Sequence, residues 1–181
     1  MSVQEIVKPI FKPGSAKKLL RVTIMAAVMS LIAFIVSVAP ASAGGATQIS
    51  GSADLSGEGC NAGFGTYAIG LSGDLVGCNY VTIETSVCSS SGTYRETGTE
   101  YYVITDGYWK GTFSTTYVFT GKYEGCDKEN GAPLGAEIFG RCQHPIVAGS
   151  GTGMFEGVTG RLDYKDYPAI DEYPYRGHLR W

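Results

Sequence analysis

The chain has 181 residues and a formal net charge of −3 at neutral pH, with 14 basic residues against 17 acidic ones. Nucleic acids and anionic membrane surfaces are bound through basic patches, so this balance argues against both as partners. The 26 glycines and 12 tyrosines, without a sustained 3.6-residue apolar repeat, indicate a β-rich fold rather than a helical one.

The first 43 residues have the pattern of a secretory signal peptide. Five basic residues precede an apolar run over residues 22–38, and Ala41 and Ala43 then match the A-x-A cleavage rule. We expect cleavage after Ala43, export from the cell, and no membrane contact afterwards. An uncleaved N-terminal membrane anchor is the alternative, although the apolar run is short for a span of about 20 residues.

The mature chain, residues 44–181, has the length of a single domain. The leader has a net charge of +4, so its removal leaves the mature chain near −7. Residues 44–63 are small and polar and predict a loose N-terminal arm, and residues 64–181 predict the folded domain. We expect no metal and no cofactor, because the sequence lacks C-x2-C spacings, His-x-x-x-His pairs, P-loops and dinucleotide fingerprints.

All five cysteines lie in the mature chain, where export allows disulfides to persist. The odd number leaves at least one thiol unpaired, and the spacing permits several arrangements. We expect Cys78 to pair with Cys60 or Cys88, and Cys126 to pair with Cys142 across a hairpin. A Cys78–Cys142 bridge across the barrel is the alternative.

Runs of alternating apolar and polar residues, separated by turn residues, continue along the mature chain. Asp106-Gly107 is a strong turn signal, and glycines recur inside the strand patterns, where they commonly mark bulges or barrel corners. Seven or eight antiparallel strands therefore predict an all-β fold, a single closed β-barrel, with a β-sandwich as the alternative. The expected strands are residues 65–72, 75–87 with a bulge near Gly77, 93–105, 111–123, 134–142, 144–149, 158–165 and 173–181.

Residues 111–123 form the clearest strand and present an aromatic face. Alternation puts Phe113, Tyr117 and Phe119 on one side with Thr115, and we expect this side to point into the barrel. Aromatic side chains suit both ligand binding and ordinary β packing. The three aromatic residues are therefore candidates for a pocket that holds a small apolar or aromatic ligand.

Residues 93–105 place two carboxylates on one face. Glu96 and Glu100 alternate there with Tyr94 and Tyr102, which are also candidate ligand-binding residues. If this face points inward, the carboxylates should have raised pKa values and could serve as a catalytic pair or a general base. The outward orientation is favoured, because a buried Glu is rare without a partner.

Glu137 and Arg141 are expected to share one face of the strand over residues 134–142, with His144 nearby. Together with Glu100 they are the candidate catalytic residues, as an acid/base site or an anion clamp. The favoured interpretation is a structural ion pair between Glu137 and Arg141 at the barrel rim, with His144 exposed or capping, because structural ion-pair networks resemble functional sites.

Residues 149–160 read Gly-Ser-Gly-Thr-Gly-Met-Phe-Glu-Gly-Val-Thr-Gly, and residues 140–147 before them read Gly-Arg-Cys-Gln-His-Pro-Ile-Val. With these segments, residues 64–181 resemble a type of small secreted bacterial β-barrel domain of unknown function. The core Gly151-Thr152-Gly153-x-Phe155 is also similar to the late Gly-Thr-Gly-x-Phe stretch of plant dirigent proteins. Those proteins share an eight-stranded barrel with allene oxide cyclases.

The resemblance implies an antiparallel barrel with an internal apolar cavity. Dirigent proteins guide phenoxy-radical coupling and the cyclases close an epoxide-derived ring, so the resemblance also suggests chemistry of this kind. Only Gly151, Thr152, Gly153 and Phe155 carry over, and they are expected to be structural, as a tight turn and an inward aromatic ring. No catalytic residue carries over.

Three functions remain open at this point. The first is a secreted, non-enzymatic barrel that binds a small apolar or aromatic ligand. The second is an extracellular enzyme of cyclase, isomerase or coupling type that uses Glu100, Glu137, Arg141 and His144. The third is a structural or interaction protein of the cell envelope that needs no cavity. The sequence does not define an oligomeric state.

Overall fold

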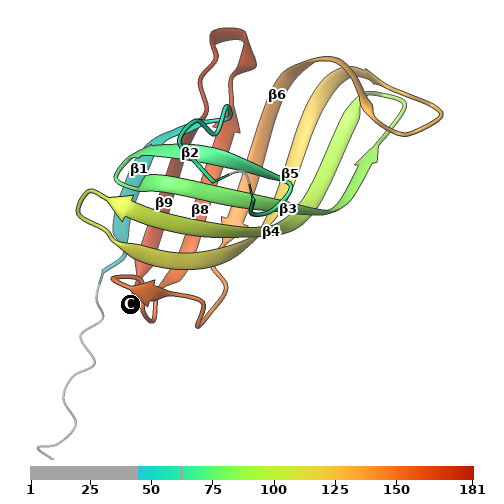
Figure 1. Cartoon of the computed structure of the whole chain (residues 1–181). Helices are drawn as coiled ribbons and strands as arrows, with labels where there is room; N and C mark the ends of the chain where they lie inside the picture. The colour runs from blue at the N-terminus through green and yellow to red at the C-terminus, as the bar shows by residue number, and fades with distance from the viewer. Residues whose placement is uncertain (1–44, 62) are drawn as a thin grey trace, which may run out of the picture. The chain divides into compact units, whose positions relative to one another are not determined.

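Eight antiparallel strands close into a β-barrel in the computed structural model, which describes residues 45–61 and 63–181 (Figure 1). The predicted signal peptide and its cleavage site lie outside the described residues. A two-residue strand, β7 (Thr152–Gly153), pairs with the start of β5, and a short 3-10 helix, η1 (Pro168–Ile170), lies between β8 and β9. The strands of the ring are β1 (Thr47–Asp54), β2 (Tyr67–Gly73), β3 (Val76–Cys88), β4 (Thr93–Asp106), β5 (Gly111–Cys126), β6 (Pro133–Pro145), β8 (Thr159–Asp166) and β9 (Pro174–Arg180).

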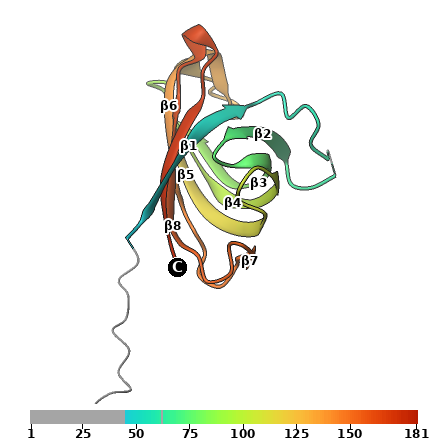
Figure 2. The same cartoon turned by 90° about the vertical axis from the view of Figure 1, so that its left-hand side faces the viewer.

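The ring has an up-and-down topology, because each strand pairs with the ring strands that precede and follow it in the sequence. The pairing of β1 with β9 completes the circle. Figure 2, turned by 90°, shows the first and last strands of the ring side by side. Closure removes the open sheet edges that would otherwise pair with other chains. The predicted closed barrel is confirmed, and the sandwich alternative is not adopted.

The expected loose N-terminal arm over residues 44–63 is replaced in its first half by a strand of the barrel. Thr47–Asp54 form β1, whose Ile49 and Ala53 side chains point inward and are buried. The segment looks polar in the sequence because its other face is exposed. Backbone hydrogen bonds to β2 and β9, together with the two buried apolar side chains, hold this strand in place.

A β-bulge in β6 breaks the alternation of that strand. Lys122 of β5 faces Phe139, but the next residue, Tyr123, faces Glu137, so Ile138 is an extra residue on β6. A bulge of this kind reverses which residues point inward on its two sides. Positions 137 and 141, which plain alternation puts on one face, therefore end on opposite faces.

The remaining strands lie within a few residues of their predicted bounds, with one exception. The expected strand over residues 144–149 is wrong, because β6 ends at Pro145 and Ile146 continues the pairing to β5 through a single bridge. The predicted irregularity at Gly77 is present as a register shift between β3 and β4. A Cβ at Gly77 would lie 2.1 Å from the Val103 carbonyl oxygen, so a side chain there is excluded.

One end of the barrel, which we call the closed end, is filled by apolar side chains. Phe113 and Phe155 are fully buried there, with ring centroids 4.8 Å apart, and Leu75 packs in the same cluster. Trp109 and Trp181 stack with centroids 5.1 Å apart, and Trp109 also packs against Phe155. This end therefore supplies much of the hydrophobic stabilisation of the fold.

The Gly151–Phe155 segment closes this end of the barrel. A Cβ at Gly151 would lie 1.7 Å from the Phe155 carbonyl oxygen, and Gly153 has a φ of 61°. The Thr152 hydroxyl accepts a hydrogen bond from the Thr112 amide at 3.1 Å. These contacts give the segment a structural role, as a tight turn that carries an inward ring.

Two disulfides brace the barrel and one cysteine stays reduced. Cys60 pairs with Cys78, and Cys88 pairs with Cys126, while Cys142 is buried and free. The expected Cys126–Cys142 bridge and its Cys78–Cys142 alternative are both wrong. Cys142 points into the barrel from β6, whereas Cys126 lies at the far end of the β5–β6 hairpin, opposite Pro133. No helix among residues 45–61 and 63–181 is long and apolar enough to cross a membrane.

Peptide mapping of the oxidised protein under non-reducing conditions should find the Cys60–Cys78 and Cys88–Cys126 links. Cys142 should react with an alkylating reagent only after unfolding, because its side chain is buried. Mass spectrometry of the digested, alkylated protein measures both results. A cross-linked peptide that contains Cys142 would contradict this arrangement.

Candidate functional site

A cavity of about 300 Å³ opens at the end of the barrel remote from the closed end. No Lys or Arg is among the described residues that line it. The aromatic rings of its wall include those of Tyr67, Tyr94, Tyr117, Phe119, Tyr123 and Tyr164. The carboxyl groups that line it belong to Glu96, Glu100, Glu137 and Asp166.

Glycines on the inward faces of two strands allow side chains that line the cavity to lie close against the barrel wall. A Cβ at Gly98 would lie 2.7 Å from Cε1 of Tyr117, so the absence of a side chain lets that ring lie across β4. A Cβ at Gly140 would lie 2.3 Å from Oε1 of Glu137 and 2.7 Å from Oδ2 of Asp166. Larger residues at these two positions would displace the groups that line the cavity.

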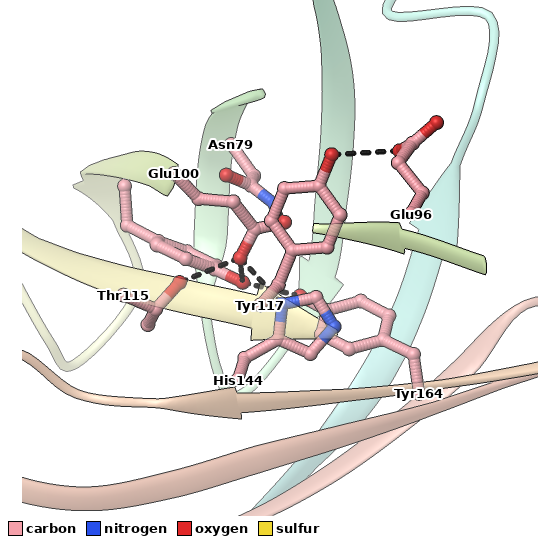
Figure 3. A network of polar contacts seen from close by, with 8 residues as sticks. Asn79, Glu96, Glu100, Thr115, Tyr117, His144 and Tyr164 are labelled. Atoms are coloured by element: carbon pink, nitrogen blue, oxygen red, sulfur yellow. Dashed lines mark hydrogen bonds and ion pairs between the residues drawn. The ribbon is translucent and has the colours of Figure 1, made fainter. Parts of the chain in front are cut away.

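Glu100 lies at the floor of the cavity, and its carboxylate accepts four hydrogen bonds (Figure 3). Asn79 Nδ2 donates to Oε1 at 2.8 Å. Thr115 Oγ1 and Tyr102 OH donate to Oε2 at 2.6 and 3.0 Å, and His144 Nδ1 is paired with the same oxygen. Glu100 is only 4% exposed. These partners allow a carboxylate to be buried there, since each replaces a hydrogen bond to water.

The pKa of Glu100 is lowered, although burial by itself would raise it. The charge of His144 and the hydrogen bonds from His144, Thr115 and Asn79 together outweigh the loss of solvation. The expected outward orientation of Glu96 and Glu100 is therefore wrong, and so is the raised pKa expected for an inward Glu100. Sequence alternation placed both carboxylates on one face. It could not show that donors from four strands would hydrogen-bond to Glu100 and so allow it to be buried.

His144 is buried and fixed in orientation by its contact with Glu100. Because Glu100 is an ionised acceptor, Nδ1 must carry the proton of this hydrogen bond, and in the neutral ring Nε2 is then an acceptor. Nε2 is buried and has no hydrogen-bond partner among residues 45–61 and 63–181. The ring packs between Tyr164 and Tyr117, with centroid distances of 4.5 and 6.0 Å.

Glu96 is held by two tyrosine hydroxyls rather than by a cation. Tyr94 donates to Oε2 at 2.5 Å and Tyr117 donates to Oε1 at 2.6 Å, and Figure 3 shows the second of these contacts. Burial first, and then the hydrogen bond to Glu96, raises the pKa of Tyr94 to about 12 and that of Tyr117 further. Both hydroxyls therefore stay protonated and continue to donate at physiological pH.

Glu137 and Asp166 form a second acidic pair, beside Gly140. Burial first, and then the negative charge of Asp166, raises the pKa of Glu137 to about 7. Burial also raises the pKa of Asp166. The hydroxyl of Tyr123 donates to Glu137 at 3.2 Å. Near neutral pH the two carboxyl groups therefore share one proton for part of the time.

Three of the four candidate catalytic residues, Glu100, Glu137 and His144, line the cavity. Arg141 does not, because the bulge in β6 turns its side chain to the outer, exposed surface. The expected Glu137–Arg141 ion pair is consequently wrong. The expected exposed or capping role of His144 is also wrong, because its ring is buried against Glu100.

Three of the five candidate ligand-binding aromatics, Tyr94, Tyr117 and Phe119, line the cavity. Tyr102 and Phe113 are fully buried beneath its floor, with rings stacked 4.5 Å apart. Tyr102 acts on the site through its hydroxyl, which donates to Glu100. Phe113 belongs to the packing of the closed end.

Several residues of the site were not selected from the sequence, among them Thr115, Tyr164, Asp166 and Asn79. Thr115 lies on the face of residues 111–123 that was expected to point inward, so a signal existed for it. Alternation along β8 likewise aligns Tyr164 with Asp166. Asn79 had no such signal, because β3 is irregular at Gly77 and alternation before that point does not extend through it.

Cys142 also lines the cavity. Burial first, and then the charge of Glu100, raises the pKa of its thiol, so it remains protonated and is not an activated nucleophile. In the part of the chain that the structure describes, no three His, Cys, Asp or Glu side chains are arranged to ligate a metal ion.

Searches against protein-family models, curated proteins and solved structures found no match to this chain. Its function is therefore inferred from the geometry of the cavity.

Glu137→Gln should raise the melting temperature at pH 8.5 and leave it unchanged at pH 4. The folded-state pKa of Glu137, about 7, lies above the ordinary value of 4.5. The stability linked to this group is therefore fully present below pH 4.5 and is lost as the pH rises through 7. Gln does not ionise, so the variant does not lose this stability at high pH. Because Glu137 is partly exposed, we expect a gain of only a few degrees, measured by calorimetry.

Glu129→Gln is the matched control, because Glu129 is exposed in the β5–β6 loop and makes no contact with the cavity. An equal gain in both variants at pH 8.5 would show that net charge, not the Glu137–Asp166 pair, causes the effect.

Proposed function

We propose that this protein is secreted and binds a small organic molecule in the cavity of its barrel. The observation that best supports this proposal is the aromatic-walled cavity of about 300 Å³, which has the size, apolar wall and few convergent polar groups of a ligand site. The closed end of the same barrel shows that the fold can fill its interior with side chains. The other end instead contains the open cavity.

The wall of the cavity suits a ligand with a flat apolar or aromatic body. Tyr94 packs against Phe119 and Tyr123, with centroid distances of 6.1 and 5.7 Å, and the second contact is edge-to-face. The hydroxyls of Tyr94 and Tyr123 are occupied by Glu96 and Glu137. Their rings are thereby held in fixed orientations, which lowers the entropic cost of ordering them around a ligand.

Secretion is supported by two independent features. The leader has the charge, apolar run and small residues of a signal peptide. The two disulfides are consistent with an oxidising compartment. The likeness to the dirigent and allene oxide cyclase barrels rests on the Gly151–Phe155 motif, which lies at the closed end and outside the cavity, so it gives no support to a particular ligand.

Binding can be tested with the neutral fluorescent probe N-phenyl-1-naphthylamine. Its fluorescence should rise when it enters the cavity of the wild-type protein. Ala53→Phe should abolish the rise, because Ala53 is buried and lines the cavity, and Phe119→Ala should weaken binding by up to about tenfold through loss of ring contacts. Fluorescence titration measures all three proteins, with near-ultraviolet circular dichroism to check folding.

Val118→Phe is the matched control for this experiment, because Val118 lies on the outer face of β5 next to Phe119. It should bind the probe like the wild type. No rise in fluorescence with the wild type, or equal rises in all variants, would contradict binding inside the barrel.

An acid/base enzyme is the second candidate function, and one observation favours it. Glu100 holds Nδ1 of His144 and leaves Nε2 without a partner in the lining of the cavity, which is the arrangement of a carboxylate-oriented imidazole base. Among the described residues no Ser, Thr or Cys side chain is hydrogen-bonded to His144. The chemistry that fits is therefore proton removal from the bound molecule rather than nucleophilic attack.

Elimination of 5-nitrobenzisoxazole tests this second function. A base removes the proton from C3 while the N–O bond breaks, and the product is a cyanophenolate that can be followed by absorbance. His144→Gln should lower a protein-catalysed rate by about 100-fold or more, whereas Arg141→Gln should not change it. A wild-type rate equal to that of buffer, or equal rates in both variants, would rule out His144 as a base for this probe.

A further inference from the structure

We infer that the ligand of this cavity is a small protonated amine that carries a second hydrogen-bond donor. This inference rests on the proposed binding function and names the chemical class of its ligand. It comes from the polar atoms of the cavity. Asn79 Oδ1, Glu137 Oε1 and, in the neutral ring, His144 Nε2 are acceptors without a partner among the described residues, and four carboxyl groups line the cavity.

Three buried side-chain atoms of the lining have no hydrogen-bond partner in the part of the chain that the structure describes: Asn79 Oδ1, Glu137 Oε1 and His144 Nε2. The orientation of the Asn79 amide is fixed, since its nitrogen must donate to Glu100, and its oxygen is therefore the free atom. Asn79 is fully buried and His144 is 4% exposed. Buried polar atoms without a partner are rare in folded proteins, so a donor from a ligand is the missing component.

The carboxylates near the mouth of the cavity have no basic partner. Within residues 45–61 and 63–181 the ion pairs are His144–Glu100 and Arg161–Asp163, and neither involves the Glu137–Asp166 pair. Oε1 of Glu137 and Oδ2 of Asp166 lie 2.3 and 2.7 Å from the point where a Cβ at Gly140 would stand, so the two carboxyl oxygens are near each other. An ammonium group can bind both oxygens, because it brings a positive charge and several N–H donors.

The aromatic wall strengthens the preference for a cation. The rings of Tyr94 and Tyr123 lie next to this acidic pair through the Tyr123–Glu137 hydrogen bond. The faces of such rings attract a positive charge. Four carboxyl groups and no Lys or Arg line the described part of the cavity, so an anionic ligand would be repelled.

The deeper acceptors call for a second donor on the same molecule. Asn79 Oδ1 and His144 Nε2 both belong to residues that bind Glu100, so they lie at the floor rather than at the mouth. A hydroxyl or a second amine at the far end of the ligand would satisfy them. An amine at one end, an apolar or aromatic middle and a donor at the other end thus match the acceptors and the wall between them.

Tyramine is a suitable probe, because it joins an ammonium group to a phenol through an aromatic ring. Tyrosol, which has a hydroxyl in place of the ammonium, and 4-hydroxyphenylacetate, which has a carboxylate there, are its neutral and anionic counterparts. Isothermal titration calorimetry of the disulfide-intact mature protein at pH 8 should give a tyramine affinity roughly tenfold or more above that of tyrosol. The carboxylate should bind more weakly than either.

Two variants locate the ammonium. Glu137→Gln should remove most of the difference in affinity between tyramine and tyrosol. Glu129→Gln makes the same change of charge on the exposed β5–β6 loop and should keep the full difference. Phenethylamine, which lacks the phenol hydroxyl, should bind more weakly than tyramine to the wild type, because the deep acceptors stay unsatisfied.

Equal affinities for tyramine and tyrosol, or an equal loss in both variants, would overturn the inference. If N-phenyl-1-naphthylamine still bound inside the barrel in that case, the proposed binding function would stand and only the amine would be wrong. If neither that probe nor any of the phenols bound, the proposed function and the inference would both fall.

Discussion

The interior of this barrel depends on the burial of one carboxylate, that of Glu100. A charge at 4% exposure is tolerated only where hydrogen bonds replace its water shell. Four consecutive strands of the ring meet this requirement: Asn79 comes from β3, Tyr102 from β4, Thr115 from β5 and His144 from β6. Removal of one of the neutral donors would leave the buried charge undersatisfied, a change that typically destabilises a protein by about 1–3 kcal/mol.

This network also divides the barrel into two halves. On one side of it, Phe113, Phe155 and their apolar neighbours form a buried cluster. On the other side, the glycines at positions 98 and 140 let lining side chains lie against the barrel wall, and the bulge in β6 turns Glu137 inward. The same fold therefore combines a packed core, which stabilises it, with a cavity whose unpaired acceptors are suited to recognition. The packed half stabilises the fold, and the fold holds the polar groups of the cavity in position.

The architecture was largely accessible from the sequence, because closure of a barrel leaves strong local signals. The alternation along residues 111–123, the Asp106-Gly107 turn and the recurrent glycines all reflect backbone constraints that act within a few residues. The strand over Thr47–Asp54 was missed, since its stability comes from pairing with β2 and β9 at the other end of the chain. Pairing between distant segments has no local signature in so polar a stretch.

The site could be predicted from the sequence only in part, because it too depends on contacts between distant segments. Alternation placed Glu96 and Glu100 together with their tyrosines, but whether that face pointed inward depended on donors from other strands. The single extra residue at Ile138 separated Glu137 from Arg141 and so undid the expected ion pair. A bulge changes every later position on its strand. Gly135 and Gly140 flank Ile138, but a glycine in a strand indicates a bulge or a bend without showing which residue is the extra one.

The central claim is that the cavity binds a ligand whose N–H or O–H groups donate to its unpaired acceptors. A crystal structure of the mature protein grown with tyramine tests this claim most directly. The account predicts a tyramine molecule inside the barrel, with its nitrogen within hydrogen-bond distance of Glu137 and its hydroxyl near Asn79 Oδ1 or His144 Nε2. A cavity that contains only ordered water at saturating tyramine, or one closed by collapse of Tyr117 and Phe119, would contradict it.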